Sequence, residues 1–148
     1  MSEINDPEFL PVMESFYTIQ GEGFYSGTPA YFVRLGGCDV GCVWCDVKES
    51  WDASKFEWFS VKQIADDAKQ SGAKVVVVTG GEPLMYDLTK LTEELSRVNL
   101  QANIETSGAY PLWAIAFANC EHIVHERRAS ECRGLTWVRY CTRLRACA

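Results

Sequence analysis

The sequence lacks features that define several large classes of protein. Its 148 residues include two histidines, both after residue 120, and we expect neither to be a metal ligand. No apolar run is long enough to span a bilayer, and the acidic first ten residues lack the apolar segment of a secretion signal. The net charge of −6 argues against a basic surface for nucleic acid. We therefore expect a cytoplasmic protein that binds neither nucleic acid nor membrane.

Cysteine, in contrast, is abundant. Seven cysteines in a chain without a secretion signal favour a reducing compartment and metal chemistry over disulfides. Three of them, Cys38, Cys42 and Cys45, lie in the run GGCDVGCVWCD with the spacing C-x3-C-x2-C. Thiolate sulfur is a matching soft ligand for an iron–sulfur cluster. Three ligands for four irons leave one iron open, which suits a cluster that must contact a small molecule.

Two alternatives explain the cysteine triplet less well. Structural zinc normally has four ligands in two close pairs, and no second pair with that spacing follows in the sequence. A redox C-x2-C formed by Cys42 and Cys45 would leave Cys38 without a function. The spacing therefore predicts one [4Fe–4S] cluster held by the three cysteines.

Periodicity and turn residues predict an α/β chain. Ser60 is a good N-cap for a helix from Val61 to about Gln70. Asp87 is the expected N-cap of a second helix, whose apolar stripe has helical spacing, 111–119 resembles a short helix, and we assign no element after Cys120. The expected strands are Glu14–Gln20, Ala30–Leu35, Lys74–Val78 and Gln101–Thr106. Strands that alternate with helices indicate a parallel sheet or barrel.

Three motifs directly follow predicted strands. They are Gly36-Gly37 before the cysteines, TGGEP at 79–83 and ETSG at 105–108. Because the carboxyl ends of parallel strands meet at one edge of a sheet, these motifs should converge on one site. Glycines in TGGEP would let the backbone approach a ligand closely, although a simple strand-to-helix turn is the alternative.

Four segments give the chain a resemblance to a known family. They are FYTIQGEGFYSGTPAYFVRLGGC at 16–38, CDVKESWD at 45–52, TGGEP and ETSG, in that order. With the cysteine triplet they resemble the 7-carboxy-7-deazaguanine synthases, which are radical S-adenosylmethionine (SAM) enzymes. The resemblance extends over about residues 12–118. It implies a partial (βα) barrel with mostly parallel strands over residues 1–120, truncated or altered at its C-terminal end.

The resemblance also implies a reaction, cofactors and partners. A [4Fe–4S] cluster and SAM would start a radical reaction that converts 6-carboxytetrahydropterin to 7-carboxy-7-deazaguanine with loss of ammonia, in queuosine and deazapurine biosynthesis. The enzyme would be a lyase and a homodimer, reduced by an electron donor such as flavodoxin or ferredoxin. Two alternatives stay open: a radical SAM activase of a partner protein, and an inactive chain that only binds a cluster or zinc.

Two sets of ligand contacts follow from the resemblance. The positions that match SAM contacts are Gly80, Gly81, Glu82, Glu105, Thr106 and Ser107. The positions that match substrate contacts are Ile19, Gln20, Gly21, Arg34 and Thr79. Gln20 can both donate and accept hydrogen bonds, as the edge of a pterin ring requires. A turn is the alternative for the QGEG segment, and a cap or turn is the alternative for Ser107.

Arg34 lies inside the apolar run YFVRL, so we expect its guanidinium to be buried. A buried guanidinium needs an acidic partner, and a substrate carboxylate is a natural one because it accepts two parallel hydrogen bonds. A structural ion pair with a neighbouring acidic residue is the alternative.

Two features depart from the family pattern. Asp46-Val47 stands where many members have Asp-Thr, so a magnesium ion near the substrate would depend on Asp46, backbone carbonyl groups, water or substrate oxygens. Residues 121–148 carry six arginines, no lysine, and three cysteines without metal-ligand spacing. We expect this Arg- and Cys-rich tail not to complete the sheet, as after a reading-frame change or a truncation, with a genuine alternative ending left open.

Overall fold

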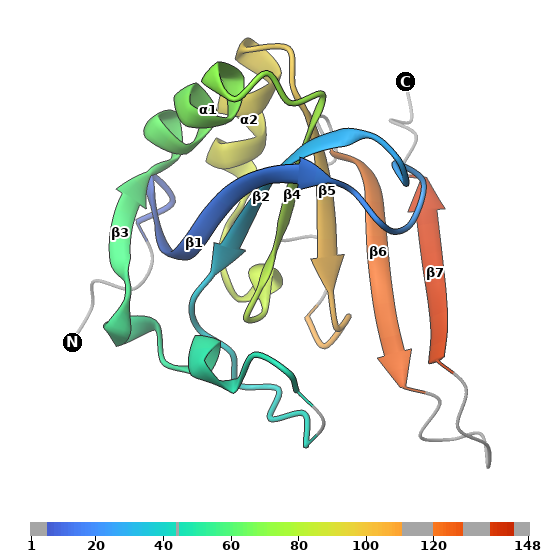
Figure 1. Ribbon diagram of the computed structural model, residues 1–148. Coiled ribbons are helices and arrows are strands. Elements are labelled where there is room, and N and C mark those ends of the chain that lie inside the picture. The colour runs from blue at the N-terminus through green and yellow to red at the C-terminus, as the bar shows by residue number, and fades with distance from the viewer. Residues whose placement is uncertain (1–5, 44, 111–119, 129–136, 144–148) are drawn as a thin grey trace.

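The computed structural model describes residues 6–43, 45–110, 120–128 and 137–143, the last two ranges as backbone strands. In the described residues, seven strands form one sheet in the order β3-β1-β2-β4-β5-β6-β7 (Figure 1). The strands are β1 (Phe9–Ile19), β2 (Pro29–Leu35), β3 (Glu57–Ser60), β4 (Val75–Gly80), β5 (Gln101–Thr106), β6 (Cys120–Arg128) and β7 (Trp137–Arg143). The helices are α1 (Val61–Gln70) and α2 (Thr89–Arg97), with short 3-10 turns at Lys48–Trp51, Ala53–Lys55 and Pro83–Met85.

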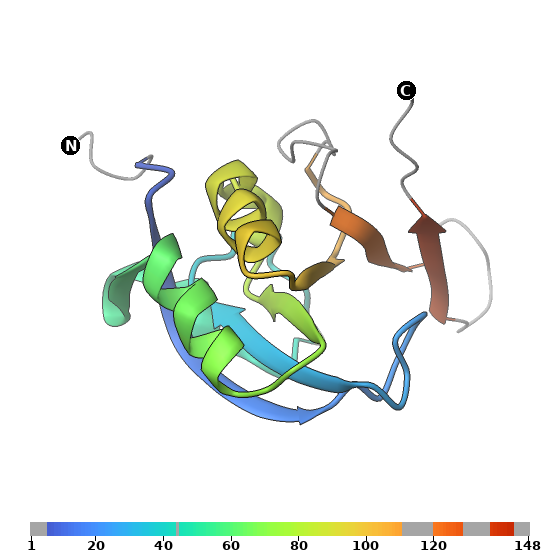
Figure 2. The same cartoon turned by 90° about the horizontal axis from the view of Figure 1, so that it is seen from above.

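The middle of the sheet is parallel and its flanks are antiparallel. β2 pairs with β4, β4 with β5, and β5 with β6 in the parallel sense, so these strands end at the same edge. β1 pairs antiparallel with β2 and β3, and β7 pairs antiparallel with β6. Viewed from above, the strands form an open arc rather than a closed barrel (Figure 2). The predicted α/β class with a mostly parallel centre is confirmed.

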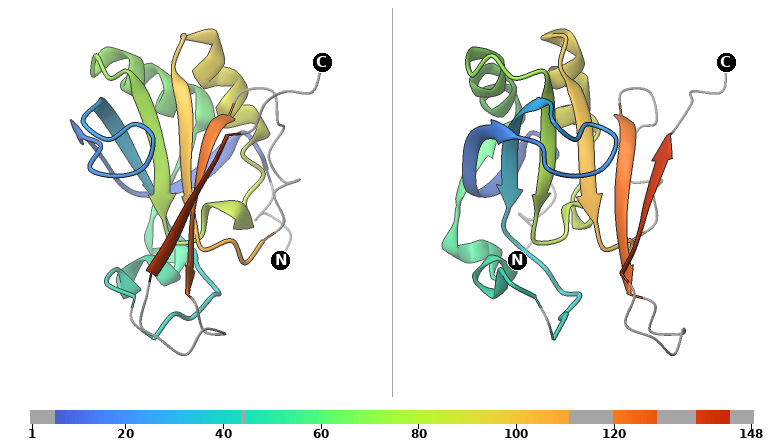
Figure 3. Two further views of the ribbon diagram at one scale, coloured as in Figure 1. Left: turned by 90° about the vertical axis from the view of Figure 1, so that its right-hand side faces the viewer. Right: turned by 45° about the vertical axis from the view of Figure 1, so that its right-hand side comes forward.

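Helices α1 and α2 lie together on one face of the sheet (Figures 2 and 3). The predicted N-cap of α1 is confirmed, because Ser60 Oγ accepts a hydrogen bond from Gln63 N–H at 3.2 Å. The main core joins apolar residues from both helices and the strands beneath them: Val33, Leu35, Val61, Ile64, Ala65, Ala68, Val76, Val78, Leu88, Leu91, Leu95, Ala102 and Ile104 are among its members. Burial of these side chains holds the helices on the sheet.

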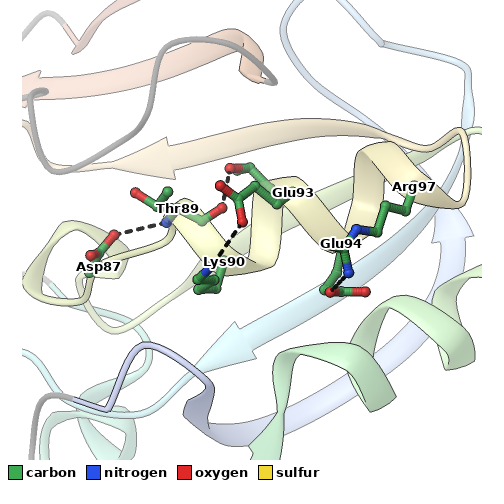
Figure 4. Close-up of polar contacts among 7 residues, drawn as sticks. Asp87, Thr89, Lys90, Glu93, Glu94 and Arg97 are labelled. Atoms are coloured by element: carbon green, nitrogen blue, oxygen red, sulfur yellow. Dashed lines mark hydrogen bonds and ion pairs between the residues drawn. The ribbon is translucent and has the colours of Figure 1, made fainter.

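The start of α2 differs by one residue from the expectation. Asp87 Oδ1 accepts a hydrogen bond from Thr89 N–H at 2.9 Å (Figure 4), but the residue at the N-cap position is Leu88. Leu88 is fully buried, so core packing sets the position of this turn. Two ion pairs on the surface of α2, drawn in Figure 4, add little stability. In the described part of the chain, no helix combines the length and apolar character needed to pass through a membrane.

The other face of the parallel strands carries the polar residues. Side chains alternate between the two faces of a strand, and the register sets Glu14 opposite Arg34, Arg34 beside Thr79, and Val77 beside Asn103. Phe16 and Phe32 stack on this side with 5.4 Å between their ring centroids. We call this surface the inner face; it is formed by Glu14, Phe16, Phe32, Arg34, Val77, Thr79, Asn103 and Glu105.

The sheet continues beyond residue 120, contrary to the expectation from the sequence. β6 extends β5 in parallel register, with Ile104 paired to Ile123, and β7 pairs with β6. The prediction that the tail stays out of the sheet is therefore wrong. Backbone pairing can form without an apolar period, and it covers the edge that a sheet ending at β5 would leave open. The helix predicted at 111–119 lies outside the described residues.

The loop that follows β2 sits directly against the loop that follows β4. Gly81 N–H donates to Leu35 O at 2.8 Å, and Glu82 N–H donates to Gly37 O at 2.9 Å. A Cβ atom on Gly81 would lie 2.1 Å from the carbonyl oxygen of Gly37, and one on Gly37 would lie 2.3 Å from the hydroxyl of Tyr86. The two glycines therefore permit a backbone contact that a residue with a side chain would prevent.

We predict that Gly81→Ala destabilises this arrangement. The added methyl group would meet backbone atoms, which cannot rotate away, so the two loops must separate. The free energy of unfolding should fall by about 1 to 3 kcal/mol, measured by denaturant unfolding of the protein without cofactors. Gly21→Ala is the matched control, because no atom lies within 4 Å of a Cβ there. Equal stability of the two variants would show that the loops do not pack as described.

Candidate active site

The loop from Cys38 to Cys45 leaves β2 at the edge where the parallel strands end. Cys38 N–H donates to Trp51 O at 3.1 Å, which holds the start of the loop, and Cys45 N–H donates to Cys42 O at 3.0 Å, which forms a turn within it. The three cysteines are half-buried and form no disulfide. Burial is the main cause that raises the pKa of the Cys38 thiol; the negative charge of Glu82 adds to it, and backbone hydrogen bonds oppose it.

The donor set of this loop fits an iron–sulfur cluster. Within the described residues, no three cysteine, histidine or acidic side chains are already grouped around one metal position. Metal sites are seldom formed before the metal binds. Gly41, with a φ of 65°, turns the chain between the first two cysteines, and a second turn joins Cys42 to Cys45, so the three cysteines lie in one short loop. Cys38, Cys42 and Cys45 are therefore the residues that could hold a cluster.

Glu82 joins the loop after β4 to the end of β5. Its side chain is fully buried, and its carboxylate accepts hydrogen bonds from Leu84 N–H at 3.0 Å, Thr106 Oγ1 at 2.5 Å and Ser107 N–H at 2.9 Å. Ser107 Oγ donates to the same carboxylate. A buried charge is tolerated only with partners of this kind. Together with the Gly37–Glu82 contact, these bonds confirm that the three predicted motifs meet at one edge.

Arg34 lies on the inner face beside Thr79 in the register of β2 and β4. Its Nη1 atom is 3.1 Å from Oε1 of Glu14, and its guanidinium carbon is 5.6 Å from the centre of the Phe16 ring. The Arg34 side chain is 34% exposed, so the expectation of a buried guanidinium is wrong. The reason is the neighbouring strand: β1 places Glu14 directly opposite, and the pair stays open to solvent.

Gln20 connects the turn after β1 to β5. It is 2% exposed, its Nε2 donates to Oε1 of Glu105 at 3.0 Å, and its Oε1 accepts from Glu22 N–H at 3.2 Å. A residue predicted to bind substrate thus contacts one predicted to bind SAM. Ile19 is 55% exposed and Gly21 is also exposed, so neither residue takes part in the contact between Gln20 and Glu105.

Sequence reasoning missed two polar features beside this site. Asn103 is 1% exposed, and neither atom of its amide has a hydrogen-bond partner. Its place two residues before Glu105 puts both on the inner face, a signal that strand alternation could have supplied. Tyr110 donates to Asp39 and so links the segment after β5 to the cysteine loop; this bond raises the pKa of Tyr110 to about 12. No local sequence pattern predicts the contact between Tyr110 and Asp39.

The residues considered for magnesium are not grouped together in the described residues. Asp46 is exposed, and the carbonyl oxygen of Val47 accepts hydrogen bonds from Ser50 N–H at 3.0 Å and Ser50 Oγ at 2.7 Å. A carbonyl oxygen has two lone pairs, and both are engaged here. The Val47 carbonyl is therefore already occupied by hydrogen bonds from Ser50.

Known proteins resemble this chain in both sequence and family signature. The family model described as the Radical SAM superfamily matches residues 32–125. The chain is 60% identical over 105 residues to a 7-carboxy-7-deazaguanine synthase of Flavobacterium psychrophilum, which covers 71% of this chain and 50% of that protein. It is 38% identical over 120 residues to the 7-carboxy-7-deazaguanine synthase of Escherichia coli K12, covering 68% of this chain and 54% of that protein.

A solved structure shares the fold. The crystal structure of QueE from Escherichia coli matches with a TM-score of 0.71 and 30% sequence identity, over 88% of this chain and 66% of that chain. The chain spans about half the length of the curated relatives it matches. The family match includes the cysteine loop and most of the parallel strands that position it. This chain therefore belongs to the radical SAM superfamily.

Proposed function

We propose that this protein is a 7-carboxy-7-deazaguanine synthase, a radical SAM lyase that converts 6-carboxytetrahydropterin to 7-carboxy-7-deazaguanine with loss of ammonia. One observation carries this proposal: the cysteine loop, the TGGEP loop and the end of β5 meet at one edge, next to an inner face that bears Arg34 and Thr79. The identity of 60% to a protein of that name supports the same reaction. The cation on the inner face suits a small carboxylated substrate.

The cofactors follow from the family. Radical SAM proteins use a [4Fe–4S] cluster and SAM, and when bound these supply the one-electron chemistry that starts the reaction at a substrate carbon. Cys38, Cys42 and Cys45 would bind the cluster through their thiolates. The backbone of Gly81 and the carboxylate of Glu105 are the groups that would orient SAM, since both lie at the edge where the parallel strands end.

The inner face would bind the substrate. The ion pair with Glu14 involves Nη1 of Arg34, and a guanidinium has five N–H donors, so a substrate carboxylate could share it. Thr79 lies beside Arg34 and would add a hydroxyl. Gln20 is held by Glu105 and by the backbone of Glu22, and its remaining N–H and lone pair would meet the pterin edge. These residues would fix the substrate while water is excluded.

Further parts of the proposal concern partners and location. We place the protein in the cytoplasm, where thiols stay reduced, with flavodoxin or ferredoxin as the electron donor. A homodimer, which the resemblance implies, is part of the same proposal. A magnesium ion would depend on Asp46 and substrate oxygens, because the Val47 carbonyl is engaged by Ser50.

We predict that changing any one of Cys38, Cys42 or Cys45 to alanine removes most of the bound cluster. Two thiolates cannot replace the third ligand of a four-iron cluster. Iron and acid-labile sulfide are measured after anaerobic reconstitution of each variant. Cys120→Ala, outside the triplet, is the control and should keep its iron. Iron contents near that of the unchanged protein in all three single variants would contradict the assignment.

We predict that Arg34→Lys weakens binding of the carboxylated pterin. Lysine keeps the charge but lacks the planar pair of donors, and losing a charge-assisted pair costs about 1.5 to 3 kcal/mol of binding free energy. Affinity is titrated for the pterin with and without its 6-carboxylate, and only the carboxylated ligand should lose affinity.

Glu14→Gln is the matched variant for this experiment. It removes the ion pair with Arg34 but leaves the guanidinium in place, so binding of the carboxylated pterin should hold or become tighter. If Arg34→Lys weakened both ligands equally, or if Glu14→Gln reproduced the loss, the role of Arg34 would be structural.

A further inference from the structure

Glu82 forms hydrogen bonds to residues that follow β2 and β4 and to the end of β5. Its carboxylate accepts from Leu84, Thr106 and Ser107, while its own N–H donates to the carbonyl of Gly37. We propose that Glu82 is a positioning residue: its carboxylate ties the end of β5 to the loop after β4, whose backbone is bonded to Gly37 at the start of the cysteine loop, and it does not itself contact SAM. This inference refines the proposed function and rests on it for the identity of the ligand. We call these hydrogen bonds the Glu82 clamp.

The carboxylate has no acceptor capacity left for a ligand. Oε1 accepts from Leu84 N–H at 3.0 Å and from Thr106 Oγ1 at 2.5 Å. Oε2 accepts from Ser107 N–H at 2.9 Å and from Ser107 Oγ. An ionised carboxylate offers about four lone-pair sites, and here four donors occupy them. The side chain is also 0% exposed, so an ammonium group of SAM could not reach it without breaking these bonds.

The direction of the neighbouring side chains gives a second, independent reason. Ala102 and Ile104 of β5 face the helices and belong to the main core. Because side chains alternate along a strand, Thr106 points to the same side, whereas Glu105 points to the inner face. The Glu82 carboxylate is bonded to Thr106 and to the backbone N–H of Leu84, a core residue, and also to Ser107, which directly follows β5. The clamp therefore lies behind the inner face and holds the surface that would meet SAM.

The geometry also requires a carboxylate rather than an amide. Each oxygen of Glu82 accepts from one backbone N–H, that of Leu84 or that of Ser107. Backbone N–H groups cannot turn to become acceptors, unlike hydroxyl groups. In Glu82→Gln, the amide nitrogen would face one of these N–H groups in either orientation, leaving a buried donor without a partner. The clamp should therefore be weakened by a substitution that barely changes side-chain size.

If the Glu82 clamp connects β5 to the cysteine loop, a substitution on β5 should increase hydrogen exchange in that loop. The Thr106 hydroxyl donates to Glu82 and accepts from Gly108 N–H, and neither partner is in that loop. Thr106→Val removes the hydroxyl and keeps the shape, whereas Thr106→Ser keeps the hydroxyl. Ser96→Ala, an exposed position on α2, controls for a change far from the site.

Hydrogen exchange is measured by mass spectrometry on the full chain without cluster or SAM. In Thr106→Val and Glu82→Gln, peptides covering 36–52 should exchange faster, because the N–H groups of Gly37 and Cys38 are bonded within that segment. The melting temperature should fall by on the order of 5 °C. Thr106→Ser and Ser96→Ala should match the unchanged protein in both measurements. Faster exchange confined to 101–110 in Thr106→Val would overturn the clamp.

SAM affinity of the reconstituted protein separates positioning from direct contact. With a clamp, Thr106→Val and Glu82→Gln both weaken SAM binding, the double variant is no weaker than Glu82→Gln, and Thr106→Ser restores affinity. If Glu82 instead contacted SAM, Glu82→Gln alone would weaken binding, with exchange at 36–52 unchanged, and the inference would fail. If Glu82→Gln does not fold, the comparison of Thr106→Val with Thr106→Ser decides whether the clamp is correct. An unchanged protein that binds no SAM would refute the proposed function, while the exchange data would still test the clamp.

Discussion

The candidate site depends on the close approach of two backbones. Gly81 lies so near the carbonyl of Gly37 that a single methyl group would fill the same space. This contact brings the loop after β2, which carries the cysteines, against the loop after β4. Parallel strands bring their loops to one edge in any such sheet, but only residues without side chains let neighbouring loops share hydrogen bonds at this distance. The cysteines are held near the other motifs because of it.

A buried negative charge close to a thiol gives the site its electrostatic character. Four donors stabilise the Glu82 carboxylate, and that charge, after burial, also raises the pKa of Cys38. The thiol is thus protonated more readily than an exposed cysteine. Binding of iron must displace this proton, while backbone hydrogen bonds at Val40 and Gly41 act on the pKa of Cys38 in the opposite direction. The Glu82 carboxylate therefore both fixes the neighbouring backbone and disfavours the ionised form of the Cys38 thiol.

Local sequence signals predicted the elements whose causes are local. The cap at Ser60 and the apolar period of α1 lie within a dozen consecutive residues, so both could be predicted. The exposure of Arg34 could not, because it depends on the register that sets Glu14 opposite it. The role of Glu82 was equally hidden, since its partners Thr106 and Ser107 lie more than twenty residues away, at the end of another strand. That the motifs meet at one edge was predictable from the strand pattern, whereas the contacts between their residues depended on tertiary structure.

Because side chains alternate along the strands, residues of the main core and residues that would bind a ligand lie on opposite faces of the sheet. Val76, Val78 and Ile104 face the helices and are fully buried, whereas Thr79 and Glu105 on the same strands face the inner face and are partly exposed. The helix-facing side can therefore be packed to a close fit without changing the groups that would meet a ligand. Glu82 and its partner Thr106 are buried polar residues beside this core, and their hydrogen bond connects it to the edge of the sheet. The hydrogen bonds of the Glu82 carboxylate therefore link the packed core to the loops that would hold the cluster and SAM.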